Sequence, residues 1–296
     1  LGTDDILRGF DKFEDVDNIE VDFLIAPESI ADANATTVVN DLVATASSLR
    51  KDCVAVASPS RNAAVTLGTN AAVLACNNTY TKSSYLVQDN NYLKVFDKYN
   101  DQFIKIPAAS STAGLMAATD LVAANWFSPA GQRRGRYLGI TDIEQSPNKS
   151  ERDTLYKAGI NPIANIPGQG IMLFGDKTNE SRPSAFDRIN VRRLFLGIER
   201  AIAIAGRNVM FEFNDEFTRA EFVNIVEPFL REIQGRRGIT DFRVVCDSTN
   251  NTAAVIDRNE FIASIFIKPA RSINFVTLNF VAVRTGVEFE EVVGTV

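Results

Sequence analysis

The stretch 21–59, VDFLIAPESIADANATTVVNDLVATASSLRKDCVAVASP, decides the fold class of this chain. It contains two short apolar runs, Val21–Ala26 and Cys53–Ala57, which predict buried strands. A proline follows each run within two residues and is expected to end the strand. Between these runs, apolar residues recur at helical spacing from Ala35 to Arg50. A strand, a helix and a strand in this order predict a parallel crossover unit of right-handed sense. We therefore expect an α/β protein.

The rest of the chain continues to alternate strand and helix patterns. Two strand-like runs, Ser84–Gln88 and Tyr92–Phe96, flank the triplet Asp89-Asn90-Asn91. Because Asn tolerates positive φ, this triplet predicts a hairpin. Further helices are predicted at Thr112–Ala124, Ser150–Lys157 and Asp187–Ala205. Further strands are predicted at Phe103–Ile106, Ile171–Phe174, Val209–Phe213, Phe242–Cys246 and Phe261–Ile267, the last of them covered on both faces.

The last third of the sequence predicts one more helix and an apolar terminal segment. Thr218 and Glu221 form a capping-box pattern, from which a helix runs to about Gln234. Ile273–Val283 reads as a strand with apolar residues on both faces, and Val287–Val293 follows it. Such a strand at a chain end is an aggregation hazard unless it is paired or covered. The sequence leaves open whether Ile273–Val283 pairs inside its own fold or with another copy.

Composition limits the functional classes. The chain has 296 residues, of which 45% are apolar and 23% charged, as in an ordinary globular protein. Its net charge of −6 argues against a general nucleic-acid binder, and no apolar run reaches the length of a membrane span. Three arginine pairs are local, and we expect them on a solvated or subunit-contacting face: Arg133–Arg134, Arg192–Arg193 and Arg236–Arg237.

Cysteine and histidine content restrict the chemistry further. Cys53, Cys76 and Cys246 are expected to be reduced, which fits a reducing compartment. The chain contains no histidine, so Ser-His-Asp and Cys-His nucleophiles and His-containing metal sites are absent from it. Chemistry based on carboxylates and magnesium stays open, with Asp4, Asp5 and Asp247 as the exposed acids it would use.

One stretch has a superficial likeness to a phosphate-binding loop. The segment Gly170–Thr178 reads GIMLFGDKT, whereas the loop requires consecutive Gly, Lys and Thr followed directly by a helix. Asp176 interrupts that order, and its charge would repel phosphate. We therefore interpret Ile171–Phe174 as a buried strand. No cofactor and no metal are expected.

Several stretches, in this order, resemble the tail sheath protein of contractile-tailed bacteriophages: Val21–Pro27, Trp126–Gly131, Gly159–Pro162, Gly168–Thr178, Ile189–Leu194, Phe211–Asn214 and Ile267–Asn274. The resemblance implies an α/β fold with a subtilisin-like sheet flanked by helices, lacking catalytic residues, followed by a smaller α+β C-terminal domain. It divides the chain into a remnant of an upstream segment at 1–20, a sheath domain at 21–180 and a C-terminal domain with a terminal strand arm at 181–296.

The resemblance also implies a structural function and no enzymatic one. Subunits are expected to form six-fold rings stacked around a tail tube and to contract, driving the tube through the host envelope. The implied partners are copies of the chain, the tube protein, and baseplate and terminator proteins, without nucleic acid or membrane contact. Assembly is expected in the host bacterial cytoplasm and the final place in the virion tail. The alternative is the sheath of a related bacteriocin or secretion-system tail.

The expected contacts between subunits combine terminal arms with charged surfaces. Extended arms would add strands to the sheets of neighbouring subunits. The candidate interface residues on the arm are Val276, Leu278, Phe280, Val287, Phe289 and Val292. The charged candidates are the arginines of the three pairs: Arg133, Arg134, Arg192, Arg193, Arg236 and Arg237.

Overall fold

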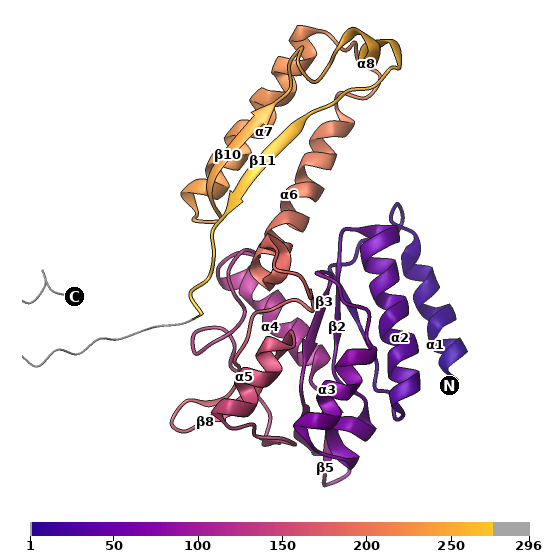
Figure 1. The fold of residues 1–296 in the computed structure, drawn as a ribbon, viewed down its shortest axis with the longest axis vertical. Helices are drawn as coiled ribbons and strands as arrows, with labels where there is room; N and C mark the ends of the chain where they lie inside the picture. Colours follow the sequence, from indigo (N-terminus) through magenta and orange to yellow (C-terminus); the bar gives the residue numbers. More distant parts are fainter. Residues whose placement is uncertain (1, 275–296) are drawn as a thin grey trace, which may run out of the picture.

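The computed structural model describes residues 2–274. Its lower part is a central domain built around a parallel sheet, and a narrower C-terminal domain rises from it (Figure 1). The long helix α6 (Ile189–Arg207) runs from the central domain into the C-terminal domain and joins the two (Figure 1). The fold is mixed α/β, as predicted.

The central sheet has four parallel strands in the order β1-β2-β3-β7. These strands are β1 (Phe23–Ile25), β2 (Val54–Ala57), β3 (Leu86–Asp89) and β7 (Ile160–Asn161). Helix α2 (Asp32–Ala44) connects β1 to β2, which lie side by side. The crossover unit predicted from 21–59 is confirmed.

Helix α2 continues as a wider helical turn over Thr45–Arg50, so the helical stretch ends where the apolar spacing predicted. Lys51 has φ 61, a left-handed conformation that stops the helix. The Arg50 guanidinium links the end of this helix to two other parts of the chain. It forms an ion pair with Asp52 at 2.9 Å and donates to the Ile19 carbonyl at 2.7 Å.

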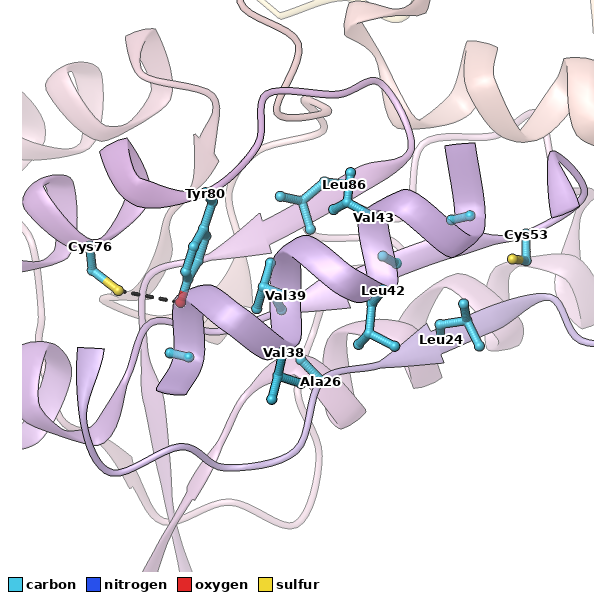
Figure 2. Packing of buried hydrophobic residues seen from close by; sticks show 14 of the residues in the cluster. Leu24, Ala26, Val38, Val39, Leu42, Val43, Cys53, Cys76, Tyr80 and Leu86 are labelled. Atoms are coloured by element: carbon cyan, nitrogen blue, oxygen red, sulfur yellow. Dashed lines mark hydrogen bonds between the residues drawn. The ribbon is translucent and has the colours of Figure 1, made fainter. Parts of the chain in front are cut away.

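The two faces of the sheet are covered by different helices. Side chains alternate along a strand, so Ala55 of β2 faces α2 while Val56 faces α4 (Ala109–Val122) and α6. Figure 2 shows the α2 side, where Val39 and Leu42 pack over the strands. Both faces are therefore buried, as is typical of parallel sheets.

The predicted hairpin between Ser84–Gln88 and Tyr92–Phe96 is wrong. β3 joins the parallel sheet, and β4 (Tyr92–Asp97) pairs with β5 (Gln102–Pro107). The reason is that Asp89-Asn90-Asn91 lies fully buried and serves as a polar anchor. For example, Asn91 Nδ2 donates to the Gln145 carbonyl at 2.6 Å.

The remaining elements of the central domain surround this sheet. Their bounds are η3 (Asn62–Thr66), α3 (Asn70–Thr79), β6 (Asp142–Ile143), α5 (Lys149–Lys157), β8 (Ile163–Ile166), β9 (Gly170–Leu173) and η4 (Ala185–Asp187). The strand expected at Ile171–Phe174 is β9, antiparallel to β8. Helix α5 has an N-terminal capping box between Asn148 and Glu151.

The first residues form a helix that the sequence analysis did not predict. Helix α1 (Thr3–Phe10) and the short turn η1 (Asp11–Glu14) lie against α2. Phe10 and Phe13 pack on the α2 cluster, with ring centroids 6.1 Å apart. The acidic side chains of this segment remain exposed.

The C-terminal domain consists of two long helices and a small sheet. Helix α7 (Glu216–Gly235) packs beside α6, and strands β10 (Ile239–Val245) and β11 (Ser264–Pro269) form an antiparallel pair. A short helix, α8 (Ala253–Asp257), lies in the connection between the two strands. The strands predicted around Phe242–Cys246 and Phe261–Ile267 thus exist, but β11 is not covered on both faces, because Phe266 is 59% exposed.

Two local predictions in this domain are wrong. Val209–Phe213 forms turns between α6 and α7 instead of a strand. Helix α7 begins earlier than the predicted capping box, because Asp215 is its N-cap and accepts from the Thr218 N–H at 2.9 Å. Thr218 therefore lies inside the first turn, where its backbone N–H is one of those a cap satisfies.

Candidate assembly surfaces

Arg192 lies inside the subunit, against the expectation of an exposed face. Its guanidinium is sandwiched between the rings of Tyr85 and Phe186, at 4.2 and 4.0 Å from their centroids. It also donates to the Ser84 hydroxyl, and the residue is only 7% exposed. Burial lowers the pKa of Arg192. The side chain is used to hold α6 on the central domain.

Arg193 is buried as well, at 6% exposure. It donates to the Met116 carbonyl at 3.1 Å, pairs with Asp120 of α4 and lies over the Phe23 ring. The prediction that Arg192 and Arg193 lie on a solvated or subunit-contacting face is therefore wrong. The apolar spacing along α6 suggested one buried face and one exposed face. Near its N-terminus, however, the helix is buried on several sides, so that its polar residues are buried as well.

The other two arginine pairs lie close together, although they are far apart in sequence. Arg133, Arg134 and Arg237 line one groove between the central and C-terminal domains. Arg236 lies beside it, stacked on Trp126 with its guanidinium 4.9 Å from the ring centroid. Trp126 Nε1 in turn donates to the Arg236 carbonyl at 3.2 Å. Their role as subunit contacts stays a prediction.

The groove is large and predominantly cationic. Its volume is about 1360 Å³, and it runs between α5 and the lower ends of β10 and β11. It adds Lys149, Arg152 and Arg271 to the arginines from the two pairs, whereas its carboxylates are Asp153 and Asp176. Sequence reasoning missed this surface because its charges come from four separate segments. Only a folded chain brings them together.

The Asp176 carboxylate, which lines the groove, binds side chains of the central domain and of the segment that follows β11. Asp176 is 4% exposed, and its carboxylate accepts from the Tyr156 hydroxyl at 3.0 Å and from the Ser272 hydroxyl at 2.5 Å. Arg188 completes the cluster with an ion pair at 3.2 Å. The segment that follows β11 thus returns to the central domain, next to the groove.

The small sheet of the C-terminal domain is open at its edges. Among residues 2–274, β10 pairs only with β11 and β11 only with β10, so each strand has one unpaired edge. An open edge presents backbone N–H and C=O groups that can pair with another strand. This is the geometry that strand addition requires.

The tip of the same domain exposes a group of large apolar side chains between and beside the ends of α6 and α7. Phe211 is 100% exposed, Phe213 83% and Phe217 76%. Phe211 also has φ 68, which is unfavourable for an aromatic residue. Large apolar side chains exposed within a few residues of one another are candidates for a contact with another molecule.

The arm candidates fall outside the described residues. Val276, Leu278, Phe280, Val287, Phe289 and Val292 all lie within 275–296. Their assignment to a subunit contact stays a prediction. Ile273, the last apolar residue before them, is 84% exposed.

The carboxylates of the enzyme alternative do not form a site. Asp4 and Asp5 belong to α1, whereas Asp247 lies in the C-terminal domain and accepts from the Thr249 N–H. Over the part of the chain that is described, no three His, Cys, Asp or Glu residues are grouped as a metal site requires. The stretch Gly170–Thr178 forms strand β9 and a buried turn, with Thr178 donating to the Phe186 carbonyl at 2.7 Å. It has no phosphate-loop geometry.

The three cysteines are buried and unpaired, as predicted. Burial raises the pKa of the Cys53 thiol to about 12, which keeps it protonated near neutral pH. Within 2–274 there is also no helix with the length and apolar character needed to cross a bilayer.

Comparison with known families agrees with a fold of this shape. The model of the phage tail sheath protein central domain matches residues 1–179, and that of the phage tail sheath C-terminal domain matches 181–282. The chain belongs to the phage tail sheath family. The sheath chain is 42% identical to the tail sheath protein of Vibrio phage KVP40 and 40% identical to that of Enterobacteria phage T4. These alignments cover 99% and 98% of the chain but 46% of each relative, so the chain spans about half their length.

Solved structures show the same fold at lower identity. The sheath chain matches a chain of the anti-feeding prophage baseplate with a TM-score of 0.79 at 20% identity, covering 96% of this chain and 75% of that one. The helical sheath of the same particle in its contracted state gives 0.78 at 20% identity, with coverage of 95% and 76%. The contracted sheath complex of an extracellular contractile injection system gives 0.75 at 20%, with 93% and 73%.

Proposed function

We propose that the sheath chain is part of a subunit that polymerises as stacked six-fold rings around a tail tube and contracts to drive that tube through the host envelope. The observation that carries this proposal is the two-stranded sheet with open edges that residues 2–274 form in the C-terminal domain. A two-stranded sheet is marginal alone and gains stability from further strands. The family membership and the likeness to contracted sheaths support the same function.

Strand addition is the proposed link between subunits. The open edges of β10 and β11 would accept extended arms of neighbouring copies, including the segment 275–296. Alternating apolar residues on that segment would then cover the exposed face at Phe266. The backbone hydrogen bonds supply affinity, and the apolar side chains set the register.

Each subunit would move nearly as a rigid body during contraction. Helix α6 contributes Leu196 to the core of the central domain and Leu194 and Ile198 to the core of the C-terminal domain. The two domains therefore share one continuous helix. Movement would be confined to the arms between subunits.

The driving force would come from new contacts between rings and not from nucleotide hydrolysis. A net hydrogen bond or surface ion pair contributes only about 1 kcal/mol, but the same contact recurs in every subunit of the lattice. In this proposal the protein has no enzymatic activity. It would assemble in the host bacterial cytoplasm, and its further partners would be the tube, baseplate and terminator proteins.

A finer structural proposal concerns the origin of the central domain. Its parallel sheet β1-β2-β3-β7, covered by helices on both faces, supports a relation to the subtilisin core, without catalytic residues. The second candidate function is the sheath of another contractile injection machine. Neighbours such as the anti-feeding prophage sheath favour that alternative.

Deletion of the terminal segment tests the proposal. In the full-length protein, removal of 287–296 should abolish tube formation, seen by electron microscopy and sedimentation, while the far-ultraviolet circular dichroism spectrum is retained. A Gly/Ser replacement of the same length serves as the control for chain length and should also fail to form tubes. Normal tubes after either change would refute the role of the arm.

A further inference from the structure

The cations that line the groove between the domains outnumber its carboxylates, which are Asp153 and Asp176. Six side chains line it as cations: Arg133, Arg134, Lys149, Arg152, Arg237 and Arg271. Within residues 2–274, none of the six forms an ion pair, since all salt bridges there involve other cations. The carboxylate of Asp176 is already engaged by Arg188. The groove therefore offers a built surface for an acidic partner.

An acidic surface of the same chain lies on the other side of the central domain. Residues 1–20 carry seven carboxylates and two cations, a net charge of −5. The acids are all exposed: Asp4, Asp5, Asp11, Glu14, Asp15, Asp17 and Glu20. Figure 1 shows α1 at one lateral edge of the molecule, and α5, which borders the groove, on the opposite side of the sheet.

On each surface, like charges add to a pKa shift that burial causes. Burial raises the pKa of Asp41, and the neighbouring carboxylates Asp11 and Glu14 raise it further. In the groove, burial lowers the pKa of Arg134, and Arg133 adds to that effect. Contact between the two surfaces would relieve repulsion on both sides at once.

We infer that the basic groove of one copy receives the acidic N-terminal segment 2–20 of another copy. The inference rests on the proposed self-assembly and names the surfaces that meet. Because groove and segment are different patches on opposite sides of one subunit, the contact is heterologous. Heterologous contacts repeat from copy to copy and generate rings or helical arrays instead of closed dimers.

Charge reversal with rescue tests this contact in the full-length protein. The groove variant carries Arg133→Glu, Lys149→Glu and Arg271→Glu, and the segment variant carries Asp11→Lys, Glu14→Lys and Asp17→Lys. None of these six side chains makes a hydrogen bond or ion pair in the described structure, so folding should be retained, as checked by thermal melting. The measurement is the protein concentration at which half of the protein sediments as polymer, at low and high salt.

Each reversal alone should raise that concentration about tenfold or more at low salt, because like charges now face each other. Both reversals in one chain should bring it part of the way back to the wild-type value, because the groove and the segment then carry opposite net charges of smaller size. High salt should shrink the differences, because exposed charges are screened. A control with the same change of net charge outside the groove, Lys98→Glu with Arg182→Glu and Arg207→Glu, should polymerise like the wild type.

Two results would overturn the inference while leaving the proposed function intact. One is polymerisation of both reversal variants at the control concentration. The other is a double reversal that polymerises no better than either single reversal. A wild-type protein that never sediments as polymer would instead refute self-assembly itself, and the contact with it.

Discussion

The central and C-terminal domains differ in how completely each one satisfies its own sheet. The parallel sheet of the central domain has four strands and is covered by helices on both faces. Among the described residues, the C-terminal sheet has two strands, packs on α7 with one face and leaves Phe266 of the other face 59% exposed. Within residues 2–274, the central sheet is therefore covered on both faces, whereas the C-terminal sheet keeps apolar surface exposed. This difference supports the proposal that folding and assembly rely on different parts of the molecule.

This comparison predicts that substitutions in the central domain change stability most. The largest effect is expected from Asp89→Asn. Asp89 is fully buried, and burial raises its pKa to about 7, although hydrogen bonds from Asn91, Ser58 and Thr112 oppose this shift. The unfolded chain has the ordinary pKa of 3.8. The wild-type carboxyl therefore stabilises the fold fully below pH 4 and loses that contribution as the pH rises through 7.

The asparagine variant does not titrate at this position. Its stability relative to wild type should therefore increase between pH 4 and pH 8, by about 4 kcal/mol, since one pKa unit corresponds to about 1.4 kcal/mol. Urea unfolding at a series of pH values measures this difference. A difference that stays constant with pH would show that Asp89 is ionised in the folded protein without cost.

The second prediction concerns the core beneath α2. Leu42 is 1% exposed and packs between α2 and the sheet, so Leu42→Ala should lower the free energy of unfolding by about 3 kcal/mol. The control is Leu121→Ala on helix α4, where the side chain is 89% exposed. It should change stability by less than about 0.5 kcal/mol. Equal losses in the two variants would contradict the placement of the core.

The third prediction addresses the seam where the two domains meet. A Cβ atom on Gly238 would lie 2.6 Å from Ile233 Cγ2 and 3.1 Å from the Trp126 ring. Gly238→Ala should therefore cost about 2 kcal/mol by overpacking, and it should change the fluorescence of this single tryptophan. Gly235→Ala, with open space around the new atom, is the matched control and should show neither change. An unaltered emission spectrum in the Gly238 variant would contradict the close packing of Gly238 against the Trp126 ring.

The sequence predicted the central domain better than the C-terminal one, for physical reasons. Val21–Ala26 and Cys53–Ala57 signalled buried strands because apolar residues fill both faces of a parallel sheet. The triplet Asp89-Asn90-Asn91 misled because buried polar networks and exposed turns use the same residue types. Local patterns also cannot show that Arg192 is enclosed by two aromatic rings from other elements.

The assembly surfaces were even less accessible to sequence reasoning. The arginine pairs at Arg133–Arg134 and Arg236–Arg237 drew attention because of their local charge. The groove that unites three of these four arginines exists only because the segment after α4 lies beside the end of α7. The acidic segment 1–20 was recognised by its composition, but its helix was not predicted. Four apolar residues of this segment pack on the cluster beneath α2, and this tertiary contact is not visible in the local sequence.

The smallest expected effect lies at the tip of the C-terminal domain and tests the comparison most directly. Phe211 is 100% exposed and has φ 68, so its ring stabilises nothing in the subunit while its backbone is strained. Because a left-handed conformation costs an L-residue about 1–2 kcal/mol, Phe211→Gly should raise the free energy of unfolding by up to about 1 kcal/mol. Phe213→Gly is the matched control: its φ is not positive, so glycine only adds entropy to the unfolded chain and should lower stability slightly.

Urea unfolding measures the change in the free energy of unfolding for each variant. A gain for Phe211→Gly and a loss for Phe213→Gly would show that the strained backbone at Phe211 does not stabilise the fold. The same Phe211 variant should then polymerise less well in the full-length protein, because an exposed ring that costs the subunit stability is useful only in a contact between molecules. If Phe211→Gly destabilised the subunit and polymerised normally, the tip would belong to the finished part of the molecule. The proposed division between a domain that folds by itself and a domain that assembly completes would then fail at this point.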